Sequence, residues 1–253
     1  MTERWQGDGE FVLPAGSVEP YRLWFEYLKL AATDPELSVD DAAYHDWGDY
    51  RAVAFSRWWS EHWRSLFAVR TKVAALEPGA VVPSDSGAIT LSIPLSGKTD
   101  AVLAQVTAYL GKEGFNLQRQ GRYALSLNYE QGFLKQLDKA RRYLRLYGLW
   151  LRHADADPRK RIERSARDYV RWYEGWEAKI RAGSKRRVTP LPFFYKVFVG
   201  YLDAVANGVT SRGGQVAFDL GNAENARRQV VRDIKIARRL AANVAKGVFP
   251  GAY

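Results

Sequence analysis

The chain has 253 residues, 47% of them hydrophobic, and a formal net charge of +10 at pH 7. Such a length and composition allow a buried core and exclude a disordered tail. Cysteine is absent, which excludes disulfides, thiol catalysis and zinc sites with cysteine ligands.

The positive charge is concentrated in the C-terminal half of the chain. Residues 1–133 carry 12 Lys+Arg against 17 Asp+Glu, whereas residues 134–253 carry 26 against 11. This asymmetry favours a polyanionic partner, with nucleic acid ahead of an anionic membrane surface. We expect a cytoplasmic protein without a membrane partner, because no signal peptide is evident and no stretch approaches the roughly 20 apolar residues of a membrane span.

Periodicity and turn signals predict a mainly α fold with helical N-terminal and C-terminal parts around a small α/β insertion. We divide the chain into a flexible lead-in, an acidic Trp-rich helical part, a small α/β segment with two or more strands, and a basic helical part. Their ranges are 1–16, 17–77, 78–130 and 131–253.

In the N-terminal part, two helices are predicted, over about 18–32 and about 50–75. The second helix has apolar and aromatic residues at alternating steps of four and three, which indicate a buried seam. The seam consists of Phe55, Trp59, His62, Leu66, Val69 and Val73, and Trp58, Trp63 and Phe67 widen it. We interpret these aromatics as core, with a base-stacking platform as the alternative.

The predicted insertion has strands over 88–95 and 122–129 and a helix that starts near Thr99 and ends near Gly111 or Gly114. Ser96-Gly97-Lys98-Thr99 matches the end of a phosphate-binding loop. However, a serine holds the place of that motif's first glycine. We therefore expect Thr99 to cap the next helix.

At least four helices are predicted in the basic part, the first over about 133–153 with Arg142 and Arg145 away from the core. Residues 193–209 are predicted to form a hydrophobic helix or helix pair that packs behind the basic ones. Asp157 and Pro158 suit the N-cap and first position of the second helix. Its buried seam is predicted to contain Ile162, Ala166, Tyr169, Tyr173, Trp176 and Ile180, and its opposite face Lys160, Arg164, Arg167 and Arg171.

The last predicted helix runs from an N-cap at Asn222 to a stop at Gly247. At 100° per residue it separates apolar from basic residues most completely. The apolar stripe consists of Ala226, Val230, Ile234, Ala237, Ala241 and Val244, and the opposite face of Arg228, Arg232, Lys235, Arg239 and Lys246.

These features predict a DNA-binding protein that contacts duplex DNA through basic helical faces, in a regulatory or DNA-maintenance role. A basic loop with Lys185, Arg186 and Arg187 is a further predicted contact. Asn225 and Gln229 supply short polar side chains for reading bases near the start of the last helix. RNA remains open as the nucleic acid.

Three alternatives remain. Each basic face could simply be solvated. The protein could be an adaptor subunit of a nucleoprotein or RNA-containing complex, with a protein partner on the Trp-rich N-terminal part. An enzyme is the third alternative, for which Asp40, Asp41, Asp46 and Asp49 could bind a metal; we nevertheless predict no catalytic residue, metal or cofactor.

Overall fold

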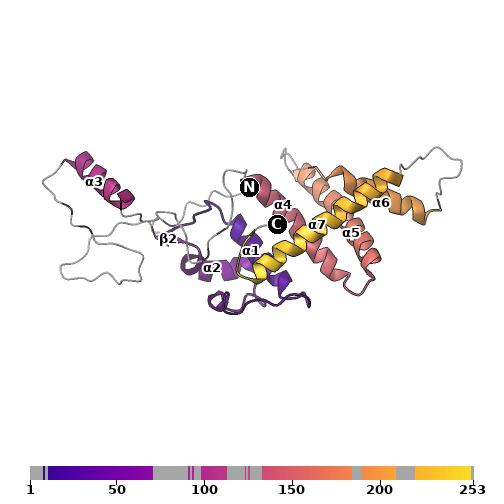
Figure 1. Cartoon of the computed structure of the whole chain (residues 1–253), viewed down its shortest axis with the longest axis horizontal. Helices are drawn as coiled ribbons and strands as arrows, with labels where there is room; N and C mark the ends of the chain where they lie inside the picture. The colour runs from indigo at the N-terminus through magenta and orange to yellow at the C-terminus, as the bar shows by residue number, and fades with distance from the viewer. Residues whose placement is uncertain are drawn as a thin grey trace.

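The computed structural model describes residues 8, 11–70, 91, 93, 98–112, 123, 125, 133–183, 190–208 and 220–251. Over these residues the protein is mainly α-helical, which confirms the predicted fold class at that level (Figure 1). The helices are α1 (Glu19–Ala31), α2 (Phe55–Leu66), α3 (Thr99–Lys112), α4 (Phe133–Arg152), α5 (Pro158–Gly183), α6 (Phe193–Ala206) and α7 (Leu220–Ala245), with a short 3-10 helix η1 (His45–Trp47).

Four helices of the C-terminal part pack as a closed ring. α4 packs against α5 and α7, and α6 packs against the same two helices. α5 and α7 share only a small contact, so they occupy diagonal corners of the ring. α1 packs on α4 and α7, which joins the N-terminal part of the chain to the ring.

The apolar stripe predicted for the last helix is buried in α7. All six of its residues, from Ala226 to Val244, are at most 4% exposed. The predicted stop at Gly247 is also confirmed: its φ is +80°, and the Gly247 and Val248 amides donate to the carbonyls of Val244 and Asn243. This pattern closes the helix with a glycine in the left-handed conformation.

The predicted start of this helix at Asn222 is wrong. Helical backbone already begins at Leu220, so Asn222 lies inside the first turn and its side chain is exposed. The N-cap prediction for α5 is confirmed, because Asp157 Oδ1 accepts hydrogen bonds from the amides of Arg159 and Lys160, each at 3.1 Å.

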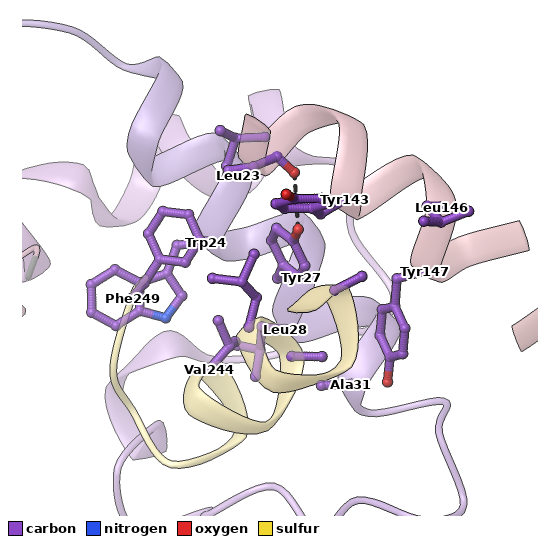
Figure 2. Close-up of a cluster of buried hydrophobic side chains, with 14 of the residues drawn as sticks. Leu23, Trp24, Tyr27, Leu28, Ala31, Tyr143, Leu146, Tyr147, Val244 and Phe249 are labelled. Atoms are coloured by element: carbon purple, nitrogen blue, oxygen red, sulfur yellow. Dashed lines mark hydrogen bonds between the residues drawn. The ribbon is translucent and has the colours of Figure 1, made fainter. Parts of the chain in front are cut away.

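Side chains of α1 contact the segment that follows α7 near the C-terminus. The Trp24 ring stacks on Phe249, which follows α7, with centroids 5.9 Å apart (Figure 2). Trp24 Nε1 donates to the Tyr44 hydroxyl at 2.8 Å, and that hydroxyl donates to the Val244 carbonyl. The loop after α1 is therefore fixed to the C-terminal end of α7 by satisfied buried polar groups.

The helix predicted over 50–75 is shorter in the structure. α2 spans Phe55–Leu66, and Val69–Arg70 form a two-residue strand, β2, which pairs antiparallel with β1 (Phe11–Val12). The Phe67 and Ala68 amides both donate to the Trp63 carbonyl at the helix end, and Val69 and Arg70 pair with β1 instead of continuing the helix. Residues 11–13, which belong to the predicted flexible lead-in, are part of the fold, because Phe11 and Val12 form β1 and Leu13 is buried.

The predicted seam of this helix is rotated. Trp58 and Trp63 are buried, whereas Trp59 is only half-buried. Trp58 Nε1 donates to the Trp47 carbonyl at 2.6 Å, and the two indole rings pack 4.7 Å apart. The contact with η1 thus determines which side of α2 faces inward. The helical periodicity of the sequence does not predict this contact.

In the predicted insertion, α3 confirms the helix expected there. Figure 1 shows α3 apart from the other helices. The strands predicted over 88–95 and 122–129 lie outside the described residues except for single positions, so they stay predictions. The helical parts on either side share one continuous core, which extends from Leu13 to Phe249.

The position of Phe249 predicts a large stability effect. Phe249→Ala should lower the free energy of unfolding by about 3–5 kcal/mol, because it empties a fully buried site between Trp24 and Tyr27. Urea denaturation measures this loss. Val248→Ala is the matched control: Val248 is 42% exposed, and its truncation should change stability by less than about 0.5 kcal/mol. Equal effects of the two substitutions would contradict the described packing of the C-terminus.

Candidate nucleic-acid interface

The outward side of α7 carries a row of cationic side chains. All five residues predicted for this face, Arg228, Arg232, Lys235, Arg239 and Lys246, are exposed. From Arg228 to Lys246 the row extends about 27 Å, at roughly 1.5 Å per residue. The row faces solvent because the opposite stripe of α7 is buried on α1, α4 and α6.

The carboxylates of α7 hardly neutralise this row. Glu224 lies at the start of the row and pairs with Arg227 and Arg228 at 3.4 and 3.6 Å. The other carboxylate, Asp233, is turned inward and accepts a 3.0 Å hydrogen bond from the Tyr195 hydroxyl. Burial raises the pKa of Asp233, against the opposing effects of Tyr195 and Arg142. Beyond Glu224, the row therefore has no exposed carboxylate of α7 beside it, and Glu36 of the loop after α1 pairs with Arg238 rather than with a residue of the row.

The predicted face of α5 is more nearly neutral. Lys160, Arg164 and Arg171 are exposed, but Lys160 lies 3.6 Å from Asp157 and Arg171 lies 3.8 Å from Asp168. The fourth residue of this face, Arg167, is 34% exposed and pairs with Asp203 of α6 at 3.1 Å. Part of the predicted α5 contact surface thus joins two helices of the ring.

The two faces point in opposite directions. α5 and α7 both bury their apolar sides against α4 and α6 and occupy diagonal corners of the ring. The outward sides of two such helices are directed away from each other. A straight duplex can lie along one face only, and a ligand that contacts both has to pass around the ring.

Some predicted contacts receive no structural description. The basic loop with Lys185, Arg186 and Arg187 lies outside the described residues. The candidate base-reading residues Asn225 and Gln229 are exposed on one flank of the α7 row.

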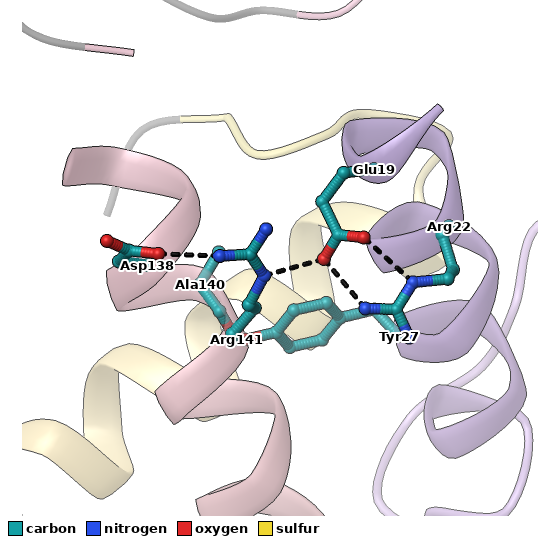
Figure 3. Close-up of polar contacts among 6 residues, drawn as sticks. All are labelled: Glu19, Arg22, Tyr27, Asp138, Ala140 and Arg141. Atoms are coloured by element: carbon teal, nitrogen blue, oxygen red, sulfur yellow. Dashed lines mark hydrogen bonds and ion pairs between the residues drawn. The ribbon is translucent and has the colours of Figure 1, made fainter. Parts of the chain in front are cut away.

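The structure also brings together arginines that the sequence analysis did not connect. Glu19 of α1 accepts two hydrogen bonds from Arg22, at 2.7 and 2.9 Å, and one from Arg141 Nε of α4 at 2.6 Å (Figure 3). Arg141 Nη1 also donates to Asp138 at 2.6 Å. These ion pairs form one wall of a groove of about 480 Å³ between α1, α4 and α5.

Arg142 and Arg145 also line this groove. We expected both to point away from the core, but each is only partly exposed, and the Nε atom of each is buried without a hydrogen-bond partner. Burial lowers the pKa of Arg145, and the positive charge of Arg152 acts in the same direction. The sequence signal was the close spacing of Arg141, Arg142 and Arg145, but α1 and α5 are needed to form the groove.

The aspartates considered as metal ligands have local roles. Asp40 Oδ1 accepts from the Ala42 and Ala43 amides, and Asp49 Oδ1 from the Ala52 amide. Within the described ranges, no group of three or more His, Asp or Glu side chains is arranged to hold a metal ion. None of the helices described is long and apolar enough to cross a membrane.

At the motif that resembles the end of a phosphate-binding loop, α3 begins with Thr99 as its first residue. Thr99 therefore does not precede the helix as a cap. Lys98 is exposed, and Ser96 and Gly97 lie outside the described residues.

Comparisons of the chain with models of known protein families, with curated proteins and with solved structures gave no match. The geometry of the two basic faces and of the groove is therefore the basis for the functional argument.

The Glu19 ion pairs predict a pH-dependent contribution to stability. Burial acts to raise the pKa of Glu19, but the hydrogen bonds and charges of Arg22 and Arg141 outweigh it, so the pKa is below the ordinary 4.5. A carboxyl with a lowered pKa stabilises the fold above its unfolded pKa, and this contribution disappears as the pH falls through the folded value. Glu19→Gln should lower the free energy of unfolding by about 1 kcal/mol at pH 7, because its partners are partly exposed and screened.

Urea denaturation at pH 7 and pH 3 measures this effect, and the difference between the variant and the parent protein should shrink at pH 3. Glu61→Gln is a control, because Glu61 makes only an exposed ion pair with Arg57 at 3.6 Å. A loss of the same size at both pH values would show that Glu19 acts through packing rather than charge.

Proposed function

We propose that the protein binds duplex DNA through the basic face of α7, as a cytoplasmic protein with a regulatory or DNA-maintenance role. The observation that carries the proposal is the row from Arg228 to Lys246, exposed along one helix and, beyond Glu224, without an intervening carboxylate. Within the described part of the chain, Arg232, Lys235, Arg239 and Lys246 make no ion pair with a carboxylate. Their charge is available to an external anion.

The physical basis is the release of counterions from the phosphate backbone. Each phosphate that a protein cation neutralises releases condensed counterions, so affinity falls steeply with salt. A rigid helix holds its cations at fixed intervals, so little conformational entropy is lost when several phosphates are contacted together. Asn225 and Gln229, beside the row, are the proposed base-reading residues.

The other predicted contacts belong to the proposal as secondary ones. Lys160, Arg164, Arg167 and Arg171 on α5, together with Lys185, Arg186 and Arg187, would meet DNA that passes around the ring. The carboxylate partners of the α5 cations favour α7 as the principal contact. We further propose that residues 78–130 form the small α/β segment expected from their sequence.

An adaptor with a protein partner on the Trp-rich N-terminal part is the second candidate. It requires tryptophans at the surface, because exposed aromatic residues dominate binding energy at protein interfaces. Trp24, Trp47, Trp58 and Trp63 are at most 6% exposed. These four tryptophans belong to the core, whereas Trp59 is half-buried and Trp5 lies outside the described residues. The burial of the four weakens the adaptor as a candidate.

Charge reversal on α7 tests the proposal. The double substitution Arg232→Glu, Lys235→Glu should weaken binding to a 20-base-pair duplex about tenfold or more and reduce the slope of log affinity against log salt by about 2. Fluorescence anisotropy over a salt series measures both quantities, and matched single-stranded DNA and RNA identify the preferred nucleic acid.

Arg164→Glu, Arg171→Glu on α5 is the matched control, because it makes the same change in net charge on the opposite side of the ring. We expect a clearly smaller loss of affinity in this variant. Equal losses in the two variants would contradict α7 as the principal contact face. Unchanged affinity in the α7 variant, with an intact circular dichroism spectrum, would refute α7 as the contact face.

A further inference from the structure

The groove between α1, α4 and α5 contains two arginines whose Nε atoms are buried without a hydrogen-bond partner. Arg142 and Arg145 line it, and among the described residues neither makes an ion pair or a side-chain hydrogen bond. Opposing charges, Asp233 for Arg142 and Asp168 for Arg145, act on them without an ion pair. A cation held partly out of water without a counter-charge in contact is destabilising, and a bound anion offsets that cost. The groove therefore has a chemical reason to take up an anionic group.

The ion pairs beside these residues keep other guanidinium groups in place. Arg22 donates to Glu19 through Nε and Nη2. Arg141 donates to Glu19 through Nε and to Asp138 through Nη1. No hydrogen bond in the described structure uses Arg22 Nη1 or Arg141 Nη2. The groove lining contains four arginines and two carboxylates, Glu26 and Asp138. Glu19 adds a third carboxylate that contacts two of the arginines, so one positive charge remains in excess.

The α5 side of the groove is aromatic. Trp172 and Trp176 stack with their ring centroids 6.0 Å apart and their planes 16° from parallel. The Arg145 guanidinium lies 5.2 Å from the centre of the Trp172 ring. Trp176 was predicted to be buried, but it is 37% exposed and lines the groove. A planar ring that enters the groove can therefore stack next to a guanidinium group.

We propose that this groove is a binding site for a nucleoside phosphate, with the phosphates on Arg142 and Arg145 and the base against Trp176. The volume of about 480 Å³ lies within the range of sites for ligands of this size. Guanidinium groups bind phosphate oxygens through paired N–H donors, and an indole face accepts any planar base. The inference does not rest on the proposed DNA contact, because the groove is formed by helices other than α7.

Isothermal titration calorimetry of the full chain tests the site, with ADP, pyrophosphate and adenosine as probes. ADP should bind at least about tenfold more tightly than pyrophosphate, which lacks the base, or adenosine, which lacks the charge. Arg145→Gln should weaken ADP binding about tenfold or more, because it removes a charged donor. Trp176→Leu should weaken ADP but leave pyrophosphate unchanged, since it removes only the stacking surface.

Arg171→Gln is the control, because Arg171 lies on α5, as Trp176 does, but does not line the groove. It should leave ADP binding unchanged, and circular dichroism checks that each variant is folded. Duplex DNA binding should be unaffected by Arg145→Gln, so failure of this site is distinguishable from failure of the α7 contact. Absence of ADP binding, or ADP binding that neither Arg145→Gln nor Trp176→Leu weakens, would overturn the proposal.

Discussion

The apolar stripe of α7 is buried on three helices at once, α1, α4 and α6, and this burial determines the direction in which the cations of α7 point. A helix whose core side is occupied over its whole length has only its opposite side available to a ligand. Phe249, just beyond α7, continues the same buried surface onto α1. The position of the proposed DNA surface is therefore a consequence of core packing.

The ring of helices places arginines in three different electrostatic environments. On α7, Arg228, Arg232 and Arg239 are exposed, and beyond Glu224 these arginines make no ion pair within the described part of the chain, whereas Arg238 pairs with Glu36. On α5 most of the corresponding cations have a carboxylate nearby, and Arg167 bridges to α6. In the groove, Arg142 and Arg145 are partly buried, and the Nε atom of each has no hydrogen-bond partner. The paired arginines of α5 add cohesion between helices, whereas contact with an extended polyanion on α7 and capture of a small anion in the groove are the roles that we propose.

Local sequence signals predicted the elements that depend on local physics. The α7 stripe, its glycine stop and the Asp157 cap of α5 follow from helical periodicity and the hydrogen bonds of helix ends. The length and rotation of α2 could not be predicted in the same way. They depend on β1, from the start of the chain, and on Trp47, which packs against Trp58.

The groove could not be predicted from the sequence either, because it also depends on contacts between distant segments. Glu19 and Arg141 are 122 residues apart in sequence, and their ion pair exists only because α1 packs on α4. Periodicity placed Arg142 and Arg145 on the outside of α4, but it contains no information on which helix will cover that side. Periodicity also identified the basic residues of α5 and of α7. It could not predict that the two faces point in opposite directions, because that depends on the order of the helices in the ring.

Lysine acetylation footprinting of the parent protein can show whether the outward side of α7 contacts DNA, as we propose. The exposed lysines Lys235 and Lys246 lie on the α7 row, whereas Lys196 is exposed on α6 and is an internal reference. With saturating duplex DNA, acetylation should slow at Lys235 and Lys246 and remain unchanged at Lys196. Unchanged acetylation at the two α7 lysines would contradict the proposed contact.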